Sequence, residues 1–138
     1  MKVFRSAVRI AASPERIWAT LVDSAKWPEL DSSLSRVDGT PCPGGKVTVH
    51  SKQGRPFPLN VAEFVPSQRL VLTGGMPLGL FTGRRTYTLA PQSDGAVQFT
   101  MHEEFSGPLA PLVSRAIPDL QPAFDEFASN LKKRAEAI

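Results

Sequence analysis

The sequence predicts an α+β fold: a curved antiparallel sheet of six to seven strands around a long C-terminal helix, with two short helices after the first strand. Residues 35–107 form short alternating segments joined by turns, the pattern of an antiparallel sheet with one buried face. The last third of the chain changes to the apolar spacing of an amphipathic helix. Because the apolar faces of helix and sheet must bury each other, we expect the helix to pack inside the curve of the sheet.

The N-terminal elements follow from alternation and from helix-start signals. Residues 3–11 alternate apolar and polar side chains and predict the first strand. Ser13 can cap a helix whose first position is Pro14, and Glu15 complements the positive end of its dipole. A second short helical turn, broken by Pro28, is predicted in the stretch AKWPEL.

The remaining strands and the last helix complete the prediction. The strands are expected at residues 35–39, 46–51, 57–65, 69–76, 80–90 and 97–107. The turn PQSDG joins the last two of them as a hairpin. Residues 109–117 have helical spacing, and a long helix should begin near Asp119, which can cap it. Lys132, Lys133 and Arg134 suit the negative end of that helix.

The composition excludes several classes of function. With 138 residues, 41% hydrophobic and 21% charged, the chain is expected to form one domain, residues 1–138. The net charge of +3 is small and the basic residues are scattered, which argues against nucleic-acid binding. The single cysteine, Cys42, allows no intrachain disulfide or thiolate metal cluster. We find no signal peptide and no membrane span, and we expect a soluble, cytoplasmic protein without stable membrane insertion.

Motifs typical of cofactor and metal sites are missing from the sequence. The sequence has no phosphate loop, dinucleotide-binding fingerprint or nucleophile elbow, so we expect no cofactor. His50 and His102 are far apart in the chain, and in a strand His102 faces away from Glu103. We therefore expect no metal site.

Five stretches of the chain together resemble a known superfamily. They are ASPERIWATLVD, WPEL, GLFTGRRTYTL, EEFSGPLAPL and PAFDEFASNLKKRAE, and the likeness extends from Val3 to Glu136. In this order they resemble the START-like (helix-grip, Bet v 1-like, SRPBCC) superfamily, and within it the bacterial polyketide cyclase/dehydrase and lipid-transport group. The resemblance implies a helix-grip fold with an internal cavity for a hydrophobic ligand. Members bind ligands of many kinds and only some are enzymes, so no catalytic residue can be carried over.

One carboxylate breaks the apolar face of the strand at 97–107. Val97, Phe99, Met101, Glu103 and Phe105 share one face of this strand. An ionised carboxylate in such a setting is costly unless it is paired and hydrogen-bonded. Glu103 therefore calls for a partner inside the protein.

The preceding strand supplies a candidate partner, Arg85, which shares its inward face with Tyr87. The polar residues on the other face of that strand should face water. A hairpin at PQSDG is expected to place Arg85 opposite Met101, with Glu103 opposite Gly83 and diagonal to Arg85. We expect an Arg85–Glu103 ion pair. The two side chains either contact a ligand or interact only with each other.

These inferences define a predicted ligand site and leave three interpretations of function open. We expect the cavity to be lined by Arg85, Glu103, Tyr87, Phe99, Met101, Phe81, Phe124 and Trp27. The favoured interpretation is binding or transport of a hydrophobic or amphipathic small molecule, rather than catalysis. The alternatives are a cyclase/dehydratase-type enzyme acting on a polyketide-like substrate, and a partner-binding module with a filled cavity. The sequence identifies neither catalytic residues nor the oligomeric state.

Overall fold

The computed structural model describes residues 3–137 and contains one seven-stranded antiparallel sheet, ordered β1-β7-β6-β5-β4-β3-β2. The strands are β1 (Val3–Ile10), β2 (Leu34–Asp38), β3 (Lys46–Ser51), β4 (Pro56–Val65), β5 (Arg69–Met76), β6 (Phe81–Pro91) and β7 (Val97–Ser106). The helices are α1 (Pro14–Val22), α2 (Trp27–Leu30), α3 (Ala110–Val113) and α4 (Gln121–Glu136). Short 3₁₀ turns occur at η1 (Ser24–Lys26), η2 (Pro77–Gly79) and η3 (Ser114–Ala116).

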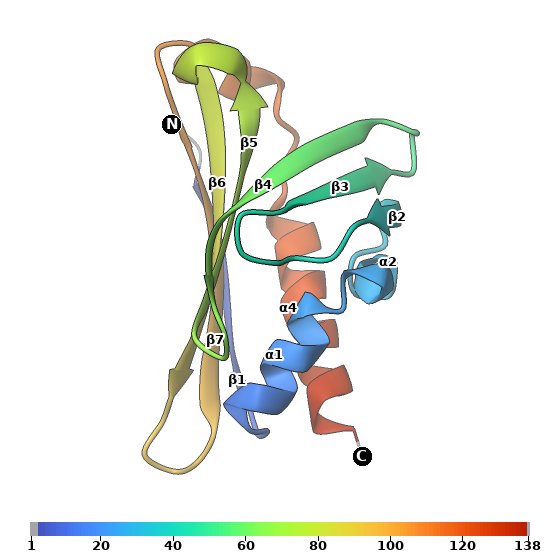
Figure 1. The fold of residues 1–138 in the computed structure, drawn as a ribbon, viewed down its shortest axis with the longest axis vertical. Coiled ribbons are helices and arrows are strands. Elements are labelled where there is room, and N and C mark those ends of the chain that lie inside the picture. Colours follow the sequence, from blue (N-terminus) through green and yellow to red (C-terminus); the bar gives the residue numbers. More distant parts are fainter. Residues whose placement is uncertain (1–2, 138) are drawn as a thin grey trace.

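The sheet curves around the long helix. In Figure 1 the strands β1, β7, β6 and β5 form a tall layer, and β4, β3 and β2 turn out of it toward the side on which α4 lies. Helices α1 and α2 lie on this same concave side. The predicted fold class, a curved antiparallel sheet around a long C-terminal helix, is confirmed.

Helix α1 begins as its sequence predicts and is joined to α2 by a buried tryptophan. The Ser13 hydroxyl accepts a hydrogen bond from the Arg16 amide at 3.2 Å, and Pro14 occupies the first turn. The Trp27 indole donates to the Leu21 carbonyl oxygen at 2.8 Å. Pro28 lies in the first turn of α2, so it starts this helix and does not break a turn as predicted.

The register of the β6–β7 hairpin differs from the prediction by two residues. Leu89 pairs with Phe99 and Arg85 pairs directly with Glu103, because β6 continues to Pro91 before the chain turns. The predicted pairing of Arg85 with Met101 is therefore wrong. A shift of two residues leaves every side chain on its predicted face.

One outer-face residue of β6 is less exposed than predicted. Thr86 is only 2% exposed, although it was expected to face water. It pairs with Val71 on β5 and His102 on β7, so the neighbouring strands flank it on both sides.

The C-terminal helix begins one residue later than a cap at Asp119 would place it. Helix α4 starts at Gln121, and Leu120 occupies the cap position without a capping hydrogen bond from its side chain. Asp119 is therefore not the cap, although its carboxylate accepts a hydrogen bond from the Gln121 amide at 3.1 Å. The preceding stretch with helical spacing, residues 109–117, forms two short elements, α3 and η3.

Polar side chains of α4 cover the free edge of the sheet at β1. The Gln121 side chain donates to the Arg5 carbonyl oxygen at 2.6 Å and accepts from the Arg5 amide at 3.3 Å. Near the other end of α4, Lys132 donates to the Arg9 carbonyl oxygen at 2.8 Å. Such contacts occupy backbone groups that would otherwise be open to pairing with another chain.

Glu136, at the end of α4, makes a further contact just beyond β1, and this one is sensitive to pH. Its carboxylate accepts from the Ala11 amide and pairs with Lys132, both at 2.7 Å, and these interactions, that with Lys132 foremost, lower its pKa. A carboxyl group with a lowered pKa stabilises the fold above its ordinary pKa, and this contribution is lost as the pH falls through the lowered value. We therefore expect the Ala11 contact to open as the pH falls through that window.

The Ala11 amide resonance, followed by NMR during an acid titration, measures this opening. The Glu136→Gln variant should lose the pH-dependent change, whereas Glu15→Gln, at an exposed position of α1, should retain it. An Ala11 resonance that stays constant until the whole protein unfolds would contradict the expectation.

Candidate functional site

The predicted ion pair is present on the concave face of the sheet. Arg85 on β6 donates from Nε to Glu103 Oε1 on β7 at 3.0 Å, and from Nη2 to Oε2 at 3.5 Å. The side chains are 27% and 13% exposed, respectively. The direct cross-strand pairing allows this two-point contact. The carboxylate that looked out of place in an apolar strand is thus held by a guanidinium from the next strand.

Two aromatic side chains complete the surroundings of Arg85. The guanidinium carbon lies 4.7 Å from the centroid of the Phe124 ring on α4, a cation–π contact. Tyr87 lies two residues further along β6 and is close enough to Arg85 for each side chain to shift the pKa of the other. We call Arg85, Glu103 and Tyr87 the polar cluster.

The electrostatics of the polar cluster fix the charge of each donor. Burial lowers the pKa of Arg85, but Glu103 and Tyr87 raise it, and the net shift is upward, so Arg85 remains a cation. Burial raises the pKa of Tyr87, and the Arg85 charge only partly opposes this. Tyr87 is therefore a neutral phenol at physiological pH.

Most of the aromatic and aliphatic residues predicted to line the cavity lie in the packed core. Tyr87, Phe99, Met101, Phe124 and Trp27 are each at most 2% exposed. The Tyr87 ring lies 6.3 Å from Phe99 and 6.4 Å from Trp27. These side chains, Tyr87 of the polar cluster among them, belong to the hydrophobic core.

Phe81 occupies a different place from the other predicted lining residues. It is only partly buried and stacks on Phe105 with ring centroids 5.6 Å apart. Phe105 in turn lies against Phe4, whose ring centroid is 6.0 Å from that of Phe124. Phe81 therefore belongs to a second aromatic group, which Phe124 connects to Arg85. Of the eight predicted residues, Arg85, Glu103 and Phe81 keep appreciable exposed surface.

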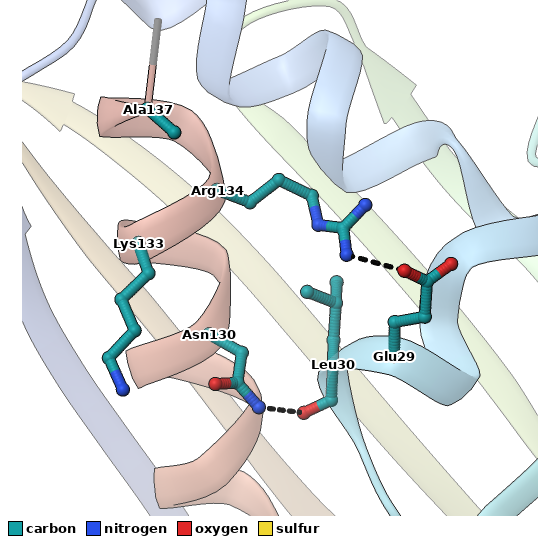
Figure 2. Close-up of a pocket in the computed structure, with 6 residues that line it drawn as sticks. All are labelled: Glu29, Leu30, Asn130, Lys133, Arg134 and Ala137. Atoms are coloured by element: carbon teal, nitrogen blue, oxygen red, sulfur yellow. Dashed lines mark hydrogen bonds and ion pairs between the residues drawn. The ribbon is translucent and has the colours of Figure 1, made fainter.

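A pocket of about 370 Å³ lies elsewhere, between α2 and the C-terminal half of α4. Figure 2 shows Arg134 reaching across it to Glu29, with an Nη2–Oε1 distance of 2.8 Å. Asn130 closes a second side by donating to the Leu30 carbonyl oxygen at 3.1 Å. Lys133 and Ala137 complete its lining. None of the eight predicted residues lines this pocket, and its polar groups largely pair with one another.

Sequence reasoning missed an apolar surface at one end of the sheet, which we call the apolar tip. It is formed by Met76, Leu78, Leu80 and Leu112, of which Leu78 is 97% and Leu112 65% exposed. The β5–β6 connection and the segment after β7 meet here, where the Leu109 amide donates to the Leu80 carbonyl oxygen at 2.9 Å. The stretches 74–83 and 105–118 contain no acidic residue. That shared absence was the signal available in the sequence.

Residues 3–137 offer neither a metal-binding cluster nor a membrane-spanning helix. Within this range no group of three or more His, Cys, Asp or Glu side chains is placed to hold a metal ion. His102 pairs with Glu104 at 3.3 Å on the face opposite Glu103. No helix in the described part of the chain is long and apolar enough to cross a bilayer.

Known proteins with this fold include enzymes and proteins of the START superfamily. An aromatase/cyclase from Streptomyces sp. R1128 has a TM-score of 0.74 at 11% identity, covering 98% of this chain and 93% of that one. A START superfamily protein from Mycobacterium smegmatis has a TM-score of 0.67 at 16% identity, covering 97% of each chain. A protein from Mesorhizobium loti has a TM-score of 0.73 at 19% identity, covering 96% and 95%. These likenesses establish the fold alone.

Sequence comparison identifies the family. No curated protein sequence matches the chain. The family described as polyketide cyclase / dehydrase and lipid transport matches residues 1–136, almost the whole chain. Because this match covers far more than half of the chain, the chain belongs to the family described as polyketide cyclase / dehydrase and lipid transport.

Proposed function

We propose that this protein binds or transports a hydrophobic or amphipathic small molecule between the sheet and α4, with the polar group of the ligand directed at the polar cluster. The observation that carries the proposal is the environment of Arg85. Its guanidinium is surrounded closely enough for burial to act on its pKa, yet its side chain keeps 27% of its surface exposed. A side chain that is closely surrounded by protein and still reaches solvent, as Arg85 does, is expected on the wall of a recess.

The chemistry of the surroundings supports a ligand that is mostly apolar. Small-molecule sites are typically lined by apolar side chains with a few convergent polar groups. The polar cluster is such a group: Phe124 on α4 packs against its Arg85, and its Tyr87 adjoins Phe99 and Met101 on β7. In this proposal Arg85, Glu103 and Phe81 contact the ligand directly. The fully buried residues shape the site from beneath, and a larger ligand reaches them by displacing α4.

Native mass spectrometry of the purified protein, followed by organic extraction, tests this proposal. We expect a stoichiometric adduct whose extract contains a lipid-like or aromatic compound. The adduct should weaken in the Glu103→Gln variant and persist in Glu104→Gln, which changes the neighbouring residue on the opposite face of β7. A mass equal to that of the bare chain, unchanged after exposure to a library of hydrophobic compounds, would refute the proposal.

Catalysis is the second candidate, because a neutral phenol beside a guanidinium can polarise a carbonyl group. If the protein is a cyclase or dehydratase, the extracted compound or its precursor should be converted by the wild-type protein. In that case Tyr87→Phe should abolish turnover while binding persists. If the wild-type protein binds the compound but does not convert it, only the binding function is supported.

A further inference from the structure

We propose that the polar group recognised at this site is an uncharged hydrogen-bond acceptor, such as a ketone, ester or quinone carbonyl, and not a carboxylate, phosphate or ammonium group. The inference rests on the proposed function and specifies the chemical class of its ligand. It follows from the balance of charges and of donors in the polar cluster.

The charges of the polar cluster already cancel. Arg85 is a cation, Glu103 binds it at two points, and Tyr87 is a neutral phenol. An anionic ligand group would compete with Glu103 for one guanidinium, leaving a partly buried negative charge without a partner. An ammonium group would meet the Arg85 charge at close range.

The next charge in the surroundings is negative. Asp31 acts electrostatically on Tyr87 and is 9% exposed. Its carboxylate is held by the Ser33 amide at 2.9 Å and the Ser33 hydroxyl at 2.6 Å. Besides Arg85, the charged residues that act on Tyr87 most strongly are Glu103 and Asp31, and both are acidic. A second anion on a ligand would therefore be disfavoured from this side as well.

Hydrogen-bond donors remain for a neutral acceptor. A guanidinium carries five N–H donors, and Glu103 engages Nε and Nη2. Among residues 3–137, the Glu103 carboxylate accepts both of the hydrogen bonds that the Arg85 guanidinium donates within 3.5 Å. Phe124 covers one face of the guanidinium, so a ligand oxygen should approach its free N–H groups in the plane. A carbonyl oxygen accepts such bonds without adding charge.

A set of four naphthalene probes with one apolar body tests this inference. They are 2-acetylnaphthalene, 2-naphthoate, 2-(aminomethyl)naphthalene and 2-ethylnaphthalene, with binding measured by isothermal titration calorimetry at neutral pH. We expect 2-acetylnaphthalene to bind about tenfold more tightly than 2-ethylnaphthalene, since it gains a hydrogen bond from a charged donor. The two charged probes should bind more weakly than 2-ethylnaphthalene.

Removing the Glu103 charge should invert this preference. In Glu103→Gln the guanidinium lacks its counter-charge, so 2-naphthoate should gain about a hundredfold over its wild-type affinity and become the tightest ligand. Glu104→Gln removes an equal charge from the outer face of the same strand and should keep the wild-type order. Arg85→Met should lower the affinity for 2-acetylnaphthalene to that for 2-ethylnaphthalene. The control is Arg84→Met, which should leave the difference between these two probes unchanged, because the Arg84 side chain pairs with Glu63. Thermal unfolding of each variant verifies that it is folded.

The outcomes separate this inference from the proposed function. If 2-ethylnaphthalene and 2-acetylnaphthalene bind equally, or if 2-naphthoate binds best to the wild type, the inference is wrong although a ligand site exists. If none of the four probes binds the wild-type protein, the proposed function itself loses its support. The expected order, with its inversion in Glu103→Gln alone, would establish the neutral-acceptor site.

Discussion

Replacing Phe127 by alanine is expected to lower the free energy of unfolding by about 3–5 kcal/mol, the range seen when a buried aromatic side chain is truncated. Phe127 joins three elements of the fold. Its ring on α4 lies 6.1 Å from Trp27 on α2 and 5.8 Å from Tyr87 on β6. Removing the ring leaves a cavity between α4 and the sheet, so the packing that holds α4 in place is weakened.

Urea denaturation followed by far-UV circular dichroism measures this loss. Ser129→Ala is the matched control, because Ser129 is exposed on the same helix. Its effect should stay within about 0.5 kcal/mol, as is usual for surface positions. A Phe127→Ala variant as stable as the Ser129→Ala control would show that α4 is held mainly by its polar contacts with β1.

Gly107→Ala is expected to destabilise the protein by about 3 kcal/mol, the sum of an unfavourable backbone conformation and overpacking. Gly107 has a φ of +102°, and an added Cβ would lie 2.6 Å from the carbonyl oxygens of Gly79 and Leu80. The methyl group would therefore force apart the two connections that meet at the apolar tip.

Gly95→Ala separates the two contributions. Gly95 also has a positive φ, +88°, but an added Cβ would meet nothing within 4 Å. It should cost only about 1 kcal/mol, the conformational part alone. Equal losses in the two variants, measured by thermal unfolding, would show that the backbone around Gly107 relaxes without strain.

The polar cluster shows how far alternation in a sequence can predict a site. The alternation of β7 placed Glu103 inward, and that of β6 placed Arg85 inward, because side chains in a strand change face at every residue. Their pairing was therefore predictable. The register was not, since β6 runs through Pro91 and the turn begins later than its sequence pattern indicated. The resulting two-residue shift converts a diagonal neighbour into a direct partner with two hydrogen bonds.

The C-terminal helix shows what local signals leave undecided. Its apolar spacing predicted the buried face that includes Phe124 and Leu131. The start of the helix was misplaced because Asp119 resembles a cap, yet the helix begins only at Gln121. The side chain of Gln121 is instead engaged with Arg5, more than a hundred residues away in the chain.

By itself the sequence determined the order of the elements, the faces of the strands and the presence of one ionisable pair inside the sheet. These follow from periodicity and from capping and turn residues, which act over a few neighbouring positions. The tertiary structure decided the register of the hairpin, the covering of β1 by α4, and which predicted lining residues remain exposed. It also brought Leu80 and Leu109 together at the apolar tip. These features depend on contacts between segments distant in the chain, whose geometry is set only when the sheet closes around the helix.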